Sequence, residues 1–244
     1  MPKARRFFIP GYHYHLTHRC HNRSFLLQRA IDRKVYREML RQRLKDFRTP
    51  LLAYCITSNH VHLLVTAGTE DRISRFMESL EGDFAQYYNL RKKRSGAFWG
   101  GRFHATAIED QSHLWQCMIY IELNMVRAGL VRHPAEWPWC SYAELMGERK
   151  RYRLVDRDHL ATAFGHHPDT PAFKSAYRHG IEQVILARAF ARQAKWTESL
   201  AIGSEAYVDH MSTLLTNRNR LDRYPEADRT DQWILKEGGP PEGA

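Results

Sequence analysis

The feature that most constrains this chain is a pair of histidines at the start of a short apolar run. Residues 58–68 read Ser-Asn-His-Val-His-Leu-Leu-Val-Thr-Ala-Gly. An apolar run of this length between turn-forming residues predicts a buried strand. Because side chains alternate between faces along a strand, His60 and His62 point to one side of the sheet and Val61 points to the other.

A second stretch, over residues 112–128, has helical periodicity and contains complementary polar groups. Tyr120 and Asn124 are four residues apart and share a helix face, whereas Glu122, the rival ligand, faces away from Tyr120. Two imidazoles and an amide can hold a divalent metal, Mn²⁺ or Mg²⁺, and a neighbouring tyrosine hydroxyl can act as a nucleophile. We therefore expect this helix to meet the histidine strand.

Charge and composition limit the partners. The chain of 244 residues has 37 Lys+Arg against 27 Asp+Glu, which gives a net charge of +10 and favours a polyanionic partner. No apolar run approaches the roughly 20 residues of a membrane span, and the basic N-terminus lacks the apolar core of a secretion signal. The four cysteines contain no Cys-x-x-Cys pair, which indicates reduced thiols. These features predict a cytoplasmic protein with no membrane contact.

The order of predicted elements indicates the fold class. Over about the first 130 residues, the patterns predict strands at 12–19, 51–57, 60–66 and 103–109 and helices at 29–47, 71–93 and 112–128. This order predicts an α+β fold, a ferredoxin-like antiparallel sheet with helices on one face. We expect this domain to span residues 1–147, followed by a helical C-terminal extension over 148–216, with a short helix starting at Ala201, and a disordered tail over 217–244.

A second His-x-His pair, His13 and His15, rivals the first. It lies among aromatic residues and is followed by Arg19 and His21 rather than by an apolar run. We expect an edge or groove-lining strand whose polar side meets nucleic acid or water, in preference to a second metal site. The rival hydroxyls at Tyr54, Tyr87 and Tyr88 lie in patterns typical of core strands and helices, so we interpret them as structural.

These motifs together resemble a known family. The segments 59–65, Trp99-Gly100-Gly101-Arg102-Phe103 and 120–129 are similar to the signatures of HUH single-tyrosine transposases. The additional Ile-Pro-Gly at 9–11 and Tyr14-His15 resemble the REP-associated branch. The similarity spans about residues 5–145. Met125 departs from the family's usual proline, and Cys20 from its usual glycine; neither change removes a catalytic residue type.

The resemblance implies a metal-dependent endonuclease and strand transferase that acts on single-stranded DNA folded as hairpins. It implies that Tyr120 forms a 5′-phosphotyrosine and releases a 3′-hydroxyl, with Mg²⁺ or Mn²⁺ held by His60, His62 and Asn124. We expect a monomer rather than a homodimer. The expected DNA contacts are Arg5, Arg6, His15, Arg19, Trp99, Arg102 and Arg127.

Two other functions are compatible with the same residues. The first is a domesticated protein that binds repeat hairpins without transposing them. The second is a metal-dependent nuclease that uses water, which predicts cleavage without a protein adduct.

Overall fold

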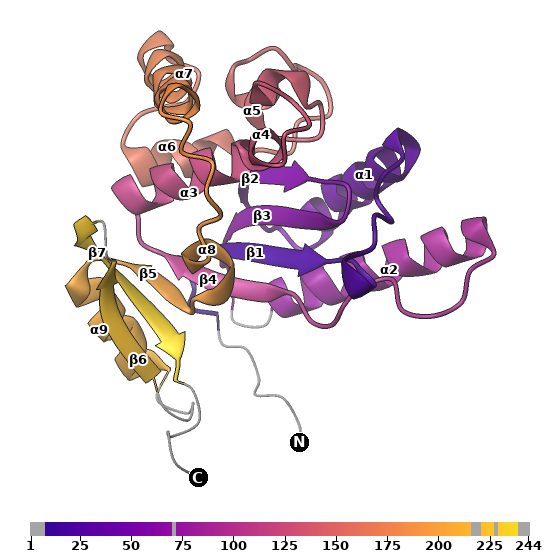
Figure 1. Ribbon diagram of the computed structural model, residues 1–244, viewed down its shortest axis with the longest axis horizontal. Coiled ribbons are helices and arrows are strands. Elements are labelled where there is room, and N and C mark those ends of the chain that lie inside the picture. The colour runs from indigo at the N-terminus through magenta and orange to yellow at the C-terminus, as the bar shows by residue number, and fades with distance from the viewer. Residues whose placement is uncertain (1–7, 70–71, 216–220, 227–228, 239–244) are drawn as a thin grey trace.

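A computed structural model describes residues 8–69, 72–215, 221–226 and 229–238, and these residues contain one mixed seven-stranded sheet with the strand order β2-β3-β1-β4-β5-β7-β6 (Figure 1). The first four strands form an antiparallel unit with β1 at its centre. Their bounds are β1 His13–Arg19, β2 Leu51–Ile56, β3 His60–Thr66 and β4 His104–Ile108. The helices that connect them are α1 Ala30–Asp46 and α2 Arg72–Lys92. The α+β class and the ferredoxin-like order of these elements are as predicted.

Helices cover both faces of this unit. On one face, His18 of β1 stacks on Trp99 with ring centroids 4.1 Å apart, and Trp99 in turn contacts Tyr36 of α1 and Phe84 of α2. On the opposite face, His15 of β1 meets Tyr120 of α3, which spans Ser112–Glu122. The prediction of helices on one face is therefore right for α1 and α2 and wrong for α3, which covers the opposite face.

The predicted helix over 112–128 is divided. It consists of α3 and the short α4, Asn124–Arg127, with Leu123 between them at φ −78° and ψ 5°. Gly129 follows with a φ of +69°, a left-handed conformation that favours glycine and ends the helix. Two short helices follow Gly129, η2 Pro134–Glu136 and α5 Tyr142–Leu145. Another short helix, η1 His21–Arg23, lies earlier in the chain, between β1 and α1.

The C-terminal part contains strands as well as helices. Its helices are α6 Arg157–Phe164, α7 Pro171–Leu186, α8 Lys195–Glu198 and α9 Glu205–Leu214, and its strands are β5 Ala201–Gly203, β6 Leu221–Glu226 and β7 Arg229–Glu237. Strand β5 pairs in parallel with β4, so residues on both sides of position 147 share one sheet.

Two predictions about this region are therefore corrected. Residues 201–203 form a strand rather than the start of a helix, and α9 begins only after Ser204, whose side chain accepts a hydrogen bond from the Tyr207 amide. The prediction of a disordered tail is wrong for 221–226 and 229–237, which pair with each other as β6 and β7. Within the described residues, the helices are too short or too polar to cross a membrane.

Candidate functional site

The two histidines of β3 point to the same face of the sheet, as predicted. His60 is half-buried, and its Nδ1–H donates to Asn59 Oδ1 at 2.6 Å. His62 is fully buried, and its Nδ1 shares a 2.8 Å hydrogen bond with Nε2 of His15. The two β3 rings lie edge to face with centroids 4.8 Å apart. Both imidazoles are therefore held through Nδ1, which leaves each Nε2 with a lone pair.

Helix α3 and the turn after it bring the tyrosine and the amide to these rings. Asn124 Nδ2 donates to His62 Nε2 at 2.8 Å, and the Tyr120 ring centroid lies 6.0 Å from that of His62. Residues from distant parts of the chain thus meet at one point. The structure brings together all four residues predicted to form the catalytic centre: His60, His62, Tyr120 and Asn124.

The surroundings of Tyr120 act on its hydroxyl in opposite directions. The ring is 7% exposed, and this burial raises the pKa of Tyr120 above its ordinary value. Against this, the Arg127 guanidinium lies 3.9 Å from the ring centroid and its positive charge lowers the pKa. Arg127 also donates to the Tyr120 carbonyl at 2.6 Å, so it is fixed beside the ring. Trp196 of α8 contacts the same ring, with centroids 5.7 Å apart.

The histidines are held neutral by burial. Loss of hydration lowers the pKa of His60 to about 3 and that of His15 to about 3, and it lowers the pKa of His62 well below its ordinary value. A neutral imidazole can ligate a metal, whereas an imidazolium cannot.

The donor set fits a small divalent cation. The described part of the chain contains no cluster of three or more His, Cys, Asp and Glu side chains suited to a metal, so among these residues a third ligand beside His60 and His62 is of another type. The Asn124 amide, already in contact with His62, can supply its Oδ1. Two imidazoles, an amide oxygen and water form a set that suits Mn²⁺ or Mg²⁺.

A cleft of about 400 Å³ opens beside the histidines. Its lining includes His60 and His62 together with residues from β1, β4 and the segment that contains α8. Four exposed arginines line it: Arg19, Arg23, Arg102 and Arg192. A cleft with this positive charge beside His60 and His62 suits a phosphodiester chain.

The predicted DNA contacts divide into several groups. Arg5 and Arg6 lie outside the described residues. Arg19 and Arg102 are exposed on the cleft and stay predictions, as does Arg127 beside Tyr120.

The prediction for Trp99 is weakened by the contacts its ring makes. The ring is half-buried and stacks on His18, and its Nε1–H donates to the Glu81 carbonyl at 3.0 Å. A ring held in this way on the α1–α2 side has little free surface for a base, and its DNA contact stays a prediction.

The direct DNA contact predicted for His15 is wrong. His15 is fully buried, and β1 is a central strand between β3 and β4 rather than an edge. The charged residues that flank His13 and His15 in the sequence favoured an edge strand. The sequence does not show that α3 and α8 cover His15. His13 is also buried, and its Nδ1 hydrogen-bonds Thr66 Oγ1 at 2.9 Å.

Three residues of the site were missed by sequence reasoning. His104 of β4 lies opposite Thr17, which in turn lies opposite His62, so the alternation of β4 could have identified it. Arg192 and Trp196 lie in a segment without a motif, and only the tertiary structure brings them to the cleft and to Tyr120.

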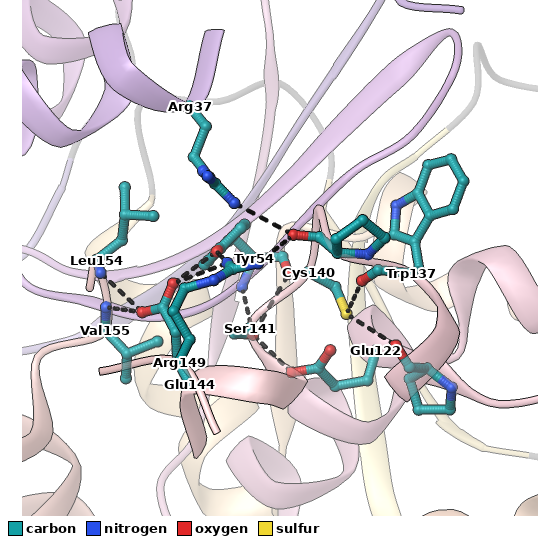
Figure 2. A network of polar contacts seen from close by, with 12 residues as sticks. Arg37, Tyr54, Glu122, Trp137, Cys140, Ser141, Glu144, Arg149, Leu154 and Val155 are labelled. Carbon is teal, nitrogen blue, oxygen red and sulfur yellow. Dashed lines mark hydrogen bonds and ion pairs between the residues drawn. The ribbon is translucent and has the colours of Figure 1, made fainter. Parts of the chain in front are cut away.

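A buried polar network fixes α3 to the sheet (Figure 2). Glu122 Oε1 accepts a 2.6 Å hydrogen bond from Ser141 Oγ, and the Ser141 amide donates to the Tyr54 carbonyl of β2. Glu144 accepts from the Tyr54 hydroxyl at 2.7 Å. Glu122 thus bonds to the 141 region and not to the histidines, as the i+2 spacing from Tyr120 predicts. Burial raises the pKa of Glu122 to about 7.

In comparisons with known proteins, part of this chain is similar to a transposase family. The family described as "Transposase IS200 like" matches residues 9–124. A protein of Haemophilus influenzae assigned as a REP-associated tyrosine transposase is 27% identical over 154 residues, which are 58% of this chain and 86% of the relative.

Two solved structures are similar. A REP-associated tyrosine transposase bound to a REP hairpin has a TM-score of 0.52 at 21% identity, over 60% of this chain and 86% of that one, and so shares the fold. A protein from Deinococcus radiodurans assigned as a transposase has a TM-score of 0.36 at 22% identity, over 50% of this chain and 96% of that one, which is too low to support an argument.

Proposed function

We propose that this chain, whose residues 9–124 match the IS200-like transposases, cleaves and rejoins single-stranded DNA through a covalent bond to Tyr120. The observation that supports this most directly is the meeting of Tyr120, His60, His62 and Asn124 at one point within one chain. A site complete in one chain also supports action as a monomer, which light scattering coupled to gel filtration would test.

In the proposed reaction, the Tyr120 oxygen attacks the phosphorus of a phosphodiester. The new bond joins this oxygen to phosphorus, and the bond from phosphorus to the 3′-oxygen breaks. The phenolic proton is released, and the departing 3′-oxygen takes up a proton to become a 3′-hydroxyl. The products are a 5′-phosphotyrosine and a free 3′ end, and attack by a 3′-hydroxyl on the phosphotyrosine reverses the step and completes strand transfer.

Arg127 and two of the cleft arginines oppose the effect of burial, which raises the pKa of Tyr120 above its ordinary value. A tyrosine with a pKa of about 10 is a poor nucleophile at neutral pH. The positive charge of Arg127 against the ring favours the phenolate, and the arginines of the cleft counter the charge of the DNA backbone. His60, His62 and Asn124 would hold a divalent cation, which when bound would supply Lewis-acid stabilisation of the charge that develops on the scissile phosphate.

For the substrate we propose single-stranded DNA folded as a hairpin. The support is the solved relative with the same fold, which is described as bound to a REP hairpin, together with the net charge of +10 and the arginine-lined cleft of this chain. Extragenic repeats from the organism's own genome are the first hairpins to test.

A covalent-adduct assay on denaturing gels tests the proposal. End-labelled hairpin DNA is incubated with Mn²⁺ or Mg²⁺ and wild-type protein, Tyr120→Phe or Tyr87→Phe. Tyr87 is a half-buried tyrosine of α2 and serves as the matched control. We expect a shifted, metal-dependent band with wild type and Tyr87→Phe and none with Tyr120→Phe. Adduct formation by Tyr120→Phe would refute the assignment, and cleavage without any adduct would indicate a water nucleophile.

A second candidate is binding of repeat hairpins without cleavage. The burial of Tyr120, which is 7% exposed and covered in part by Trp196, favours it. Tight binding of the hairpin by wild type, with no adduct under any metal condition, would support this second function over the first.

A further inference from the structure

His15 belongs to a chain of buried hydrogen bonds that ends on the metal site. His15 Nδ1 lies 2.8 Å from the Trp196 carbonyl oxygen, and His15 Nε2 lies 2.8 Å from His62 Nδ1. His62 Nε2 then accepts from Asn124 Nδ2 at 2.8 Å. The two imidazole planes are nearly parallel, at 16° to each other, with centroids 5.0 Å apart.

The direction of this chain follows from its fixed end. A backbone carbonyl can only accept, so the proton of His15 is on Nδ1. A neutral His15 then has a bare Nε2, which can only accept, so the proton of His62 is on its Nδ1. The lone pair of His62 therefore lies on Nε2, the nitrogen that faces Asn124.

From this geometry we propose that His15 is a positioning residue for the metal site. It holds His62 in the Nδ1–H tautomer, so that the Nε2 lone pair, which accepts from Asn124 in this structure, is available to the cation when the Asn124 amide turns its Oδ1 toward the metal. The inference rests on the proposed metal role of His62. Metal-ligating histidines commonly donate their second ring N–H to an acceptor that sets the tautomer and the orientation of the ring. Here the acceptor is another imidazole.

The C-terminal part of the chain provides the anchor for this relay. Trp196 lies in α8, beyond residues 9–124, and its side chain is fully buried. Its carbonyl also accepts from Thr106 Oγ1 at 3.3 Å, and Thr106 Oγ1 donates to the Ser199 carbonyl at 2.7 Å. The segment is thus held against β4, so the carbonyl that orients His15 is a rigid part of the sheet layer.

Direct measurement of Mn²⁺ affinity tests this role without any cleavage assay. Mn²⁺ is titrated by calorimetry or by electron paramagnetic resonance into wild type, His15→Leu, His15→Gln and His62→Ala. Leucine fills the space but accepts no hydrogen bond, whereas the glutamine Oε1 can replace the His15 Nε2 acceptor. We expect His15→Leu to weaken Mn²⁺ binding by about 10- to 100-fold, the usual effect of losing such a partner. His15→Gln should stay within a few-fold of wild type.

Nitrogen-15 spectra of the histidines in wild-type protein without metal give a second readout that needs no variant. We expect His62 to show a protonated Nδ1 and an unprotonated Nε2, which would support the relay even if His15→Leu failed to fold. The Nε2–H tautomer of His62 would overturn it. So would a folded His15→Leu protein that binds Mn²⁺ as wild type does while His62→Ala loses binding. If His62→Ala also binds normally, the proposed metal site is wrong, and the role of His15 toward it is wrong as well.

Discussion

Replacement of Glu122 by glutamine should change how the stability of this protein depends on pH. Glu122 is fully buried between α3 and the 141 region, and burial raises its pKa from 4.5 to about 7. Its hydrogen bond from Ser141 and the charge of nearby Glu144 act on the same carboxyl, the first lowering and the second raising its pKa. The folded protein therefore holds a proton that the unfolded chain releases at lower pH.

The size of the effect follows from linkage. A group whose pKa is higher in the folded state contributes stability that is complete below the unfolded pKa and is lost as the pH rises toward the folded pKa. Across the whole interval from 4.5 to about 7, this loss is about 3 kcal/mol at 1.36 kcal/mol per pH unit. Between pH 5 and pH 8 it is about 2.5 kcal/mol. The glutamine side chain does not titrate, so the Glu122→Gln variant should not show this part of the loss.

Urea unfolding at pH 5 and pH 8, followed by tryptophan fluorescence, measures the difference. Wild type should lose about 2.5 kcal/mol more than Glu122→Gln over this interval, while all other titrating groups cancel between the two proteins. Glu78→Gln, which removes an exposed carboxyl of α2, controls for the loss of one negative charge. Equal pH dependence in wild type and Glu122→Gln would refute a protonated, buried Glu122.

Three further perturbations test packing and the nucleophile. Trp196→Ala removes a fully buried indole and should lower the free energy of unfolding by about 3–5 kcal/mol in denaturant titration; an unchanged value would contradict its burial. Gly203→Ala places a Cβ 2.5 Å from a Tyr207 ring carbon and should lower the free energy of unfolding by about 1–3 kcal/mol. Gly82→Ala meets open space within α2 and should raise the free energy of unfolding by about 0.5–1 kcal/mol. Equal melting temperatures of the two variants would refute this contrast. Arg127→Met removes the positive charge beside the Tyr120 ring, so the rate of adduct formation should fall by about 2- to 30-fold and its increase with pH should shift to higher pH. An unchanged pH profile would show that Arg127 has no part in activating Tyr120.

Much of the proposed catalytic centre could be predicted because its spacing is local. Strand alternation places His60 and His62 on one face, and helical periodicity places Tyr120 near Asn124 although Leu123 interrupts the helix. Apolar runs and turn residues likewise predicted the first four strands and the helices between them within a few residues.

The sequence alone determined the local elements and the residue types of the site, because short-range periodicity and turn chemistry depend on neighbouring residues. Only the tertiary structure decided that β1 is central, that β5 extends the sheet and that Trp196 reaches Tyr120. Three-residue β5 has almost no pattern of its own and is defined by its pairing with β4 and β7. The polar residues beside His15 in the sequence suggested that its side chain faces solvent. In the folded protein, other residues surround it. Residues more than 180 positions away in the chain cover it, as its hydrogen bond to the Trp196 carbonyl shows.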